Sequence, residues 1–337
     1  MADYSALERM LHRLALGSNV MGEMQFDLEC GIEKPKPFAG GQHVFVTGLA
    51  RAGTTVLMRS IYGSEAFGTL TYRDMPFVMA PNLWARLHRR SSREIEISER
   101  AHGDGILVDA DSPEAFEEVF WRIFLGHRYL NDKTRGLVPH EVPSEVSENL
   151  RKYVQLILKR SGTTRYLSKN NNNILRIAAL LDIFPDARIL VPFRHPVPHA
   201  RSLLAQHQRF CEDGDRFTRA YMTWLAHHEF GPGHRPFVFS DQPNSDAPPT
   251  ELLYWFETWG AVYGYLVKMY QSHPRVHFVC YEQMCHAPQA WASLSDWLDL
   301  PAGSRSHFAV KETSPPAAAP EAFEAIYRNM TSLTHLG

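Results

Sequence analysis

The sequence predicts an α/β fold, in which a parallel sheet lies between helices on both of its faces. Two observations support this class. Hydrophobic side chains recur alternately at a spacing of two, typical of strands, and at a spacing of 3.6, typical of helices. Short β-branched runs also lead directly into helical segments, as at residues 43–61 and 187–210. Strands and helices that alternate in this way form βαβ units, which build a three-layer structure around a parallel sheet.

The N-terminal part of the chain contains four expected elements. Residues 1–10 begin an amphipathic helix. Residues 43–47 combine β-branched and aromatic side chains, which predicts a buried strand. Apolar residues at helical spacing predict a helix over 54–61, directly after this strand. A second extended run is expected at 69–72, after a short turn.

The next segment predicts two helices. Asp111-Ser112-Pro113-Glu114 combines N-cap residues with a proline, which is typical of the first turn of a helix. Apolar residues at helical spacing follow over 115–129, and a further amphipathic helix is expected at 145–159.

The second half of the chain repeats the alternation of strands and helices. Strands are expected at 165–168, 187–193 and 276–280. Helices are expected at 174–184, 197–210, 250–271 and 289–298. Residues 231–249 are rich in Gly, Pro and Asp and predict a long loop. We expect one domain over 1–337, with a core at about 40–300 and a flexible tail from about residue 313.

Composition excludes several classes of protein. The 337 residues include 35 Lys and Arg against 37 Asp and Glu, and 44% are hydrophobic, which argues against disorder and against nucleic acid as a partner. Any bound anion must therefore be held by a local cluster of charge. The apolar stretches fall short of the roughly 20 residues that a membrane-spanning helix needs. Four cysteines without a CxxC pair suit a reducing compartment, and we expect a cytoplasmic protein.

The first candidate site is the run Gly48-Leu49-Ala50-Arg51-Ala52-Gly53-Thr54-Thr55, between the first expected strand and its helix. Its glycines have the spacing of a phosphate-binding loop, in which backbone N–H groups and a helix N-terminus hold an anion. The lysine of nucleoside triphosphate loops is absent, and the cation is Arg51, which can bind a differently placed oxyanion. The alternative is a tight turn without ligand, in which Thr54 and Thr55 only cap the helix.

This run resembles the phosphosulfate-binding loop of the sulfotransferases that use 3′-phosphoadenosine 5′-phosphosulfate (PAPS), which has Lys or Arg, a small residue, Gly, Thr and Thr. The family's second motif binds the 3′-phosphate and combines an Arg at a strand end with a Ser eight residues later. Arg194 and Ser202 have this spacing. Both motifs stand at strand-to-helix junctions in the family's order, and the similarity extends over about residues 43–288.

The resemblance implies a P-loop-like sulfotransferase fold and PAPS as the cofactor. It also implies in-line transfer of a sulfuryl group to a hydroxyl or amine of a carbohydrate, a tyrosine or another small acceptor. The sequence looks more similar to the bacterial and Golgi branch than to the cytosolic phenol and steroid branch. The implied cofactor-binding residues are Arg51, Ala52, Gly53, Thr54, Thr55, Arg194, Ser202 and Tyr281. Tyr281 either stacks on adenine or packs at the edge of the core.

Transfer also needs a base for the acceptor proton. Asp74 follows the strand after the loop helix, near the place where relatives carry a catalytic His or Glu. Its alternative role is an ion pair with Arg73 or a turn cap. His102, in a glycine-flanked segment, is the second candidate, and Asp104 would orient it or bind an acceptor hydroxyl.

Lys169 ends the run 165–168 and is similar in position to a lysine of Golgi-type sulfotransferases. The resemblance implies that Lys169 neutralises charge on the bridging or sulfuryl oxygens, and that Arg51 belongs to the catalytic set as well as to the loop. The alternative for Lys169 is a solvated side chain at a helix start. No metal site is expected, because His195 and His199 have helical spacing but no carboxylate partner.

Two other functions remain as alternatives. One is a nucleotide-dependent kinase, which the missing loop lysine disfavours, and the other is a non-catalytic protein that binds adenosine 3′,5′-bisphosphate. Residues 77–110 and 210–250 are expected to shape an acceptor pocket for a small molecule, a carbohydrate or a peptide. The sequence leaves the acceptor and the oligomeric state open.

Overall fold

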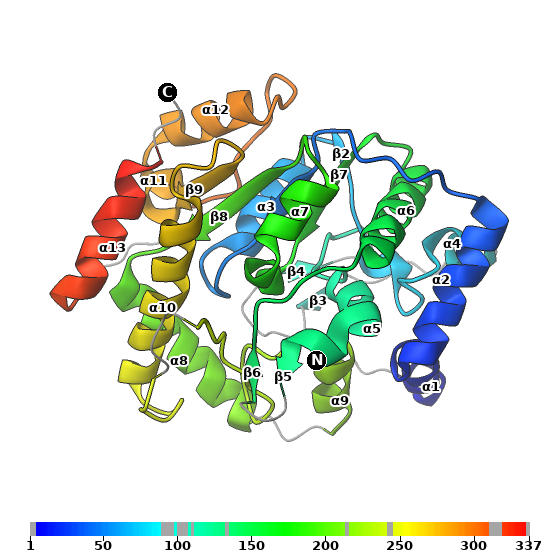
Figure 1. Ribbon diagram of the computed structural model, residues 1–337, viewed down its shortest axis with the longest axis horizontal. Helices are drawn as coiled ribbons and strands as arrows, with labels where there is room; N and C mark the ends of the chain where they lie inside the picture. The colour runs from blue at the N-terminus through cyan, green and yellow to red at the C-terminus, as the bar shows by residue number, and fades with distance from the viewer. Residues whose placement is uncertain are drawn as a thin grey trace.

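The computed structural model describes residues 5–88, 98–99, 107–108, 111–131, 135–212, 216–240, 245–309 and 319–334. At its centre lies a five-stranded sheet with the strand order β2-β7-β1-β8-β9 (Figure 1). The strands across this sheet are β2 (Phe67–Gly68), β7 (Arg165–Lys169), β1 (Val44–Val46), β8 (Arg188–Phe193) and β9 (Val276–Cys280). All neighbouring strands of the sheet are parallel, which confirms the predicted α/β class.

Strand β1 occupies the middle of the sheet because its side chains are apolar on both faces. It pairs with β7 on one side and with β8 on the other, so that Val46 lies opposite Lys169 and Leu190. Val44 to Val46 are fully buried. A strand covered on both faces requires such a continuous apolar run. The chain that follows β1 therefore emerges at the centre of the sheet's carboxyl edge.

Two hydrophobic cores cover the two faces of the sheet. Phe45 and Ile189 point into the larger core. The helices of this core include α5 (Glu118–Tyr129), α6 (Ser144–Ser161), α7 (Ile177–Ile183), α8 (Pro196–Glu212) and α10 (Leu252–Tyr270). Val46 and Leu190 point into the smaller core. Its helices include α3 (Thr54–Tyr62), α11 (Tyr281–His286) and α12 (Pro288–Trp297). Figure 1 shows α7 and α10 in front of the sheet and α3 behind it, as the three-layer prediction requires.

Further elements surround this core. The helices are α1 (Ala6–Leu16), α2 (Asn19–Glu33), α4 (Pro81–His88), α9 (Arg216–Trp224) and α13 (Glu321–Ser332), and η1 (Tyr72–Asp74) and η2 (Asn171–Leu175) are short 3₁₀ helices. Strands β3 (Ser98–Glu99) and β4 (Leu107–Val108) form one antiparallel pair, and β5 (Leu130–Asn131) and β6 (Gly136–Leu137) form another. Within the described residues, no helix combines the length and the apolar content that a bilayer span needs.

The segment after β2 differs from the extended run predicted over 69–72. Thr71 acts as the N-cap of η1, because its backbone N–H donates a 2.8 Å hydrogen bond to Asp74 Oδ2. Local side chain to backbone bonding of this kind competes with strand pairing. The chain therefore turns into a single 3₁₀ turn at Tyr72.

The predicted helix start at 111–114 is wrong. Residues 112–114 run antiparallel to the segment after β2, and Glu114 N–H donates to Leu70 O at 3.3 Å. Since the backbone of this segment is occupied by the pairing, α5 begins only at Glu118. The pairing carries Glu114 to the carboxyl side of the sheet, which matters for the site below.

The C-terminal part of the chain is packed onto the fold. The tail predicted from residue 313 falls partly on 310–318, which lie outside the described residues. Helix α13 follows and packs on α10, where a Cβ added at Gly260 would lie 2.6 Å from the Phe323 ring. Met330 is fully buried. This helix therefore belongs to the core structure and not to a linker.

A buried ion pair joins α5 to the segment after β7. Arg176 Nη1 donates to Glu118 Oε2 at 2.9 Å, and both side chains are almost fully buried. The guanidinium also lies over the rings of Trp121 and Tyr129, at 4.6 and 4.8 Å from their centroids. Asn170 Nδ2 donates to the same carboxylate at 2.6 Å. The chain directly after β7 is thus held in place by polar contacts in the core.

Candidate active site

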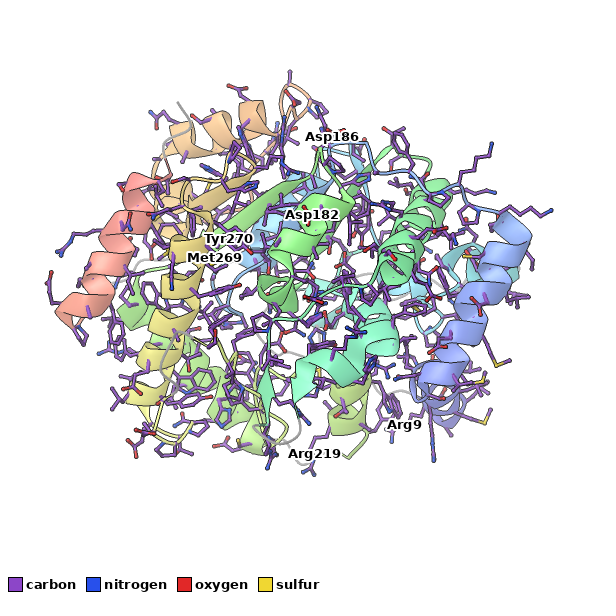
Figure 2. The ribbon with its side chains drawn as sticks, viewed as in Figure 1. Arg9, Asp182, Asp186, Arg219, Met269 and Tyr270 are labelled. Carbon is purple, nitrogen blue, oxygen red and sulfur yellow. The ribbon has the colours of Figure 1, made fainter. Side chains whose placement is uncertain are left out.

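Several of the residues singled out in the sequence meet at the carboxyl edge of the sheet. Parallel strands end at the same edge, which is where open α/β sheets bind ligands. Lys169 ends β7, Arg194 follows β8, and the loop at 48–53 follows β1. Figure 2 shows Asp186, which precedes β8, near the top of the view, so that β8 runs downwards from there towards its carboxyl end.

The backbone of the loop at 48–53 requires its two glycines. A Cβ at Gly48 would lie 2.9 Å from the Pro192 carbonyl oxygen, and Gly53 has a φ of 90°. Gly53 is also the N-cap of α3 and makes no side-chain cap. Backbone N–H groups in the first turn of α3 therefore lack a capping side chain, an arrangement that favours a bound anion.

Arg51 joins the two motifs predicted from the sequence. It adopts a left-handed conformation with a φ of 69°, which is strained for a residue other than glycine. Its Nε donates to Ser202 Oγ on α8 at 3.2 Å. The phosphosulfate loop and the 3′-phosphate motif therefore lie side by side, and the structure brings Arg51 and Ser202 into direct contact.

His199 makes a second connection between α8 and the loop. Its Nε2 lies 2.8 Å from the carbonyl oxygen of Ala50, which can only accept a hydrogen bond. Burial, with the nearby charges of Arg194 and Arg51, lowers the pKa of His199 to about 3. The ring is therefore neutral at physiological pH, with its proton on Nε2 directed at the loop.

This buried neutral ring predicts a pH dependence of stability. The unfolded chain protonates His199 below about pH 6.5 whereas the folded chain does not, so stability falls as the pH falls from 6.5 towards 3. Between pH 7.5 and 5.5, the free energy of unfolding should fall by about 1 kcal/mol less in His199→Gln than in the wild type. Glutamine keeps an N–H donor but has no group that takes up a proton in this range. Urea unfolding at both pH values measures this difference. Equal losses in the two proteins would contradict the assignment.

Arg194 presents an unsatisfied donor at this edge. Trp259 Nε1 donates to the Arg194 carbonyl oxygen at 3.2 Å, and the guanidinium lies 5.0 Å from the centroid of the Tyr281 ring. Glu282 Oε1 is 4.0 Å from Arg194 Nε, which is too long for a hydrogen bond. Nε is buried and has no hydrogen-bond partner among the described residues. An orphaned buried donor is costly, and a ligand oxygen would satisfy it.

Lys169 is buried and is not the solvated lysine that the sequence left as an alternative. Its side chain is 8% exposed, and Nζ lies 3.8 Å from Glu114 Oε1. The same carboxylate accepts the Ala115 N–H at 2.9 Å and the Tyr72 hydroxyl at 3.4 Å. Sequence reasoning missed Glu114 because it assigned the residue to a helix start. Only the pairing of 112–114 with the segment after β2 reveals its position.

A second carboxylate, Glu229, lies near Lys169. Asn171 Nδ2 donates to Glu229 Oε1 at 2.9 Å, and His227 Nδ1 is 3.5 Å from Oε2. Burial works to raise the pKa of the Glu229 carboxyl. The contacts with His227, Lys169 and Asn171 outweigh burial, so the pKa lies well below its usual range and the carboxylate is charged. Lys169 therefore lies near two glutamate side chains, Glu114 and Glu229.

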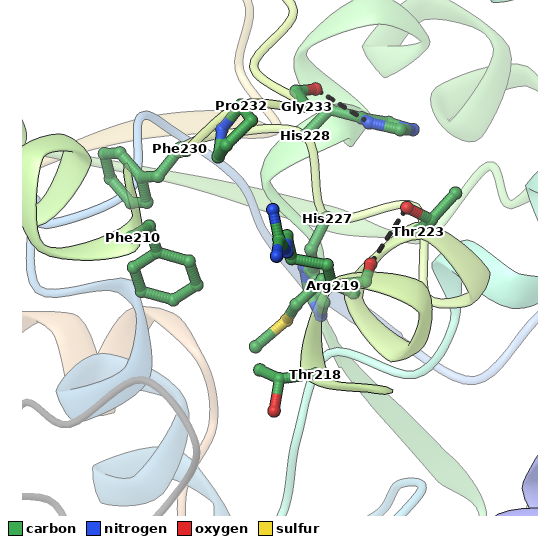
Figure 3. A pocket seen from close by; sticks show the side chains of 11 residues that line it. Phe210, Thr218, Arg219, Thr223, His227, His228, Phe230, Pro232 and Gly233 are labelled. Atoms are coloured by element: carbon green, nitrogen blue, oxygen red, sulfur yellow. Dashed lines mark hydrogen bonds between the residues drawn. The ribbon is translucent and has the colours of Figure 1, made fainter. Parts of the chain in front are cut away.

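A hollow of about 80 Å³ lies against α9, and one of its lining residues is His227, which contacts Glu229. Figure 3 shows Phe210 and Phe230 together on one side of this hollow, with Arg219 and Thr218 on the other. The two phenyl rings lie 6.1 Å apart between centroids. Since its walls come from residues 210–233, the hollow falls within one of the two segments expected to shape an acceptor pocket.

Asp74 makes contacts typical of a structural residue. Both of its oxygens bind the guanidinium of Arg160 at the end of α6, and Oδ2 also accepts the Thr71 N–H. The side chain is 2% exposed. Arg73, the partner considered from the sequence, pairs with Asp111 instead. The role of Asp74 as the base stays a prediction.

Four of the remaining sequence candidates, Ala52, Thr54, Thr55 and Tyr281, lie in or beside the loop at 48–53 and the first turn of α3. Ala52 is fully buried within the loop, and Thr54 and Thr55 begin α3 and are buried as well. Tyr281 packs on the loop, since a Cβ at Gly53 would lie 2.7 Å from its ring. His102 and Asp104 lie outside the described residues.

Comparisons with known proteins agree with this fold. The sequence profile of the Sulfotransferase family matches residues 43–238, more than half of the chain. The crystal structure of sulfotransferase STF1 from Mycobacterium tuberculosis is similar with a TM-score of 0.50 and 14% identity, covering 98% of this chain and 88% of that one. That likeness supports the same fold.

Two further structures show weaker likeness. Sulfotransferase STF9 from Mycobacterium avium has a TM-score of 0.46 and 15% identity, over 98% of this chain and 78% of that one. A sulfotransferase from Alicyclobacillus acidocaldarius has a TM-score of 0.41 and 15% identity, over 87% and 95%. No curated protein matches the sequence at a significant level.

Proposed function

Because the chain belongs to the sulfotransferase family, we propose that it takes the sulfuryl group from PAPS and transfers it to a hydroxyl or amine of a carbohydrate, a tyrosine or another small acceptor. The observation that carries the choice of donor is the orphaned Nε of Arg194 beside the loop at 48–53. PAPS bears an anionic group at each end, and the chain offers a separate cationic group for each.

The residues present fit such a donor. Arg51 and the N–H groups at the start of α3 would hold the phosphosulfate, and Arg194 with Ser202 would hold the 3′-phosphate. The ring of Tyr281, packed on Gly53, would bound the adenine side. When bound, PAPS supplies an activated sulfuryl group with a phosphate as its leaving group. A net charge of −2 makes these local cations necessary.

The side chains around Lys169 support the chemistry of transfer. Lys169 would stabilise negative charge on the sulfuryl or bridging oxygens, a contribution that is strongest in a buried site. Glu114, 3.8 Å from Lys169, is our preferred base because its carboxylate lies beside that lysine at the carboxyl edge of the sheet. Asp74 and His102 are the alternative bases. The hollow at Phe210 and Phe230 supports the placement of the acceptor on the α9 side.

The contact with the 3′-phosphate gives a direct test. We expect Arg194→Ala to weaken binding of adenosine 3′,5′-bisphosphate about 10- to 100-fold, because it removes charged hydrogen bonds. Titration calorimetry measures this affinity. Arg201→Ala is the matched control, because Arg201 is exposed on α8, beside Ser202, and the affinity of this variant should equal that of the wild type.

Two results would overturn the proposed function. Binding of Mg-ATP without binding of PAPS or its product would indicate the kinase. Binding of the product without transfer of labelled sulfate from PAPS to any member of an acceptor library would indicate the non-catalytic nucleotide-binding protein.

A further inference from the structure

Helix α13 reaches the end of β8, where Arg194 stands. Glu324 Oε1 on α13 lies 3.2 Å from Nε2 of His195, the residue directly after Arg194. The His195 ring also packs edge-on against Tyr327, with 5.0 Å between the ring centroids. The side chains of His195 and Glu324 are 11% and 18% exposed, so these contacts are largely shielded from water. A helix more than 120 residues away in sequence thus borders the predicted 3′-phosphate site.

One carboxylate, Glu282, links α13 to Arg194. Its Oε2 accepts the Tyr327 hydroxyl at 3.4 Å and faces the Cys280 thiol at 3.5 Å. Its Oε1 accepts the backbone N–H of His195 at 3.0 Å and lies 4.0 Å from Arg194 Nε. The contacts on Oε2 orient the carboxylate, and its other oxygen then faces the arginine.

We propose that α13 positions Arg194 for the 3′-phosphate of the nucleotide, with Tyr327 as the positioning residue that acts through Glu282. This inference rests on the proposed function. The guanidinium is confined between the Tyr281 ring and the Glu282 carboxylate. An arginine already confined loses less rotamer freedom on binding, and this preorganisation raises affinity. Tyr281, Glu282 and all of α13 lie beyond residues 43–238, the part that the family profile matches.

The test compares two nucleotides that differ in the 3′-phosphate. We expect Tyr327→Phe to weaken binding of adenosine 3′,5′-bisphosphate about three- to tenfold, the usual effect of one hydrogen bond. Its affinity for adenosine 5′-monophosphate, which has no 3′-phosphate, should be unchanged. Calorimetry with both nucleotides separates positioning of Arg194 from a general loss of structure, which would weaken both. In the labelled-sulfate assay, KM for PAPS should rise while kcat is unchanged.

A matched control and a double-mutant cycle test the route through Glu282. Arg328→Gln changes an exposed neighbour of Tyr327 that pairs with Glu321 along α13, and this variant should bind both nucleotides as the wild type does. In a Glu282→Ala background, Tyr327→Phe should have less than a twofold further effect, because the group that transmits its influence is gone. Glu282→Gln serves as the background if Glu282→Ala does not fold.

Three results would overturn the inference. Equal affinity of wild type and Tyr327→Phe for adenosine 3′,5′-bisphosphate would show that the hydroxyl has no role. Equal weakening of both nucleotides, or additive effects of the two substitutions, would show a role other than positioning through Glu282. Failure of the wild type itself to bind adenosine 3′,5′-bisphosphate would refute the proposed function, and the inference with it.

Discussion

Glu114→Gln is expected to lower kcat for sulfuryl transfer by roughly 10²- to 10⁴-fold, the range that a general base contributes. Glutamine has nearly the same shape and can still accept the Ala115 N–H that Glu114 binds at 2.9 Å. It cannot take up a proton, so the acceptor would lose its base while Lys169 stays in place. KM for PAPS should change little, because the base is proposed to act on the acceptor and not on the nucleotide. Steady-state transfer of labelled sulfate measures both constants.

Asp74→Asn is the matched control for this prediction. It removes the charge that pairs with Arg160 inside the fold, so we expect lower stability and unchanged kcat per folded molecule. His102→Ala tests the second sequence candidate in the same assay. A large loss of kcat in Asp74→Asn or His102→Ala, with Glu114→Gln as active as the wild type, would refute the assignment of Glu114.

Arg176→Met is expected to lower the free energy of unfolding by about 3–5 kcal/mol, because it leaves a buried charge without its partner. Glu118 is 2% exposed and could recover solvation only by local opening of the structure. The loss also removes the guanidinium that packs on Trp121 and Tyr129. Urea unfolding, followed by far-UV circular dichroism, measures the change.

The control is an ion pair on the surface. Arg73→Gln breaks the ion pair with Asp111, in which both side chains are more than half exposed. It should change the free energy of unfolding by only about 0–1 kcal/mol. The double variant Arg176→Met with Glu118→Leu should recover part of the loss, because no charge then remains buried. A loss below about 1 kcal/mol in Arg176→Met would mean that solvent reaches Glu118 and that the buried-pair account is wrong.

The sequence predicted those parts of the candidate site that are local in the chain. The loop at 48–53 and the pair Arg194 and Ser202 each stand at a junction between a strand and a helix, and such junctions are visible in periodicity and glycine placement. The parallel order of the strands then brings the junctions to one edge without further information. The buried environment of Lys169 follows from the end of β7 in the same way.

The remaining parts depend on contacts between distant segments, which local patterns do not contain. The sequence offers Arg73 as the ion-pair partner of Asp74 in its alternative role, yet the arginine that binds Asp74 is Arg160, 86 residues away. Glu114 was assigned to a helix start because Ser and Pro precede it, and pairing with another segment overrode that preference. The link from Tyr327 to Glu282 spans 45 residues and has no signature in spacing.

The two hydrogen bonds between α8 and the loop at 48–53 limit the size of the ligand that the site can bind. His199 and Ser202 lie one turn apart on α8. The His199 ring binds the carbonyl oxygen of Ala50, and the Ser202 hydroxyl accepts a hydrogen bond from Arg51 Nε. These hydrogen bonds therefore fix the distance between the two proposed anion-binding positions. A nucleotide whose charged groups are further apart could bind at one of these positions but not at both. Elongated polyphosphates should therefore bind more weakly because of their length alone.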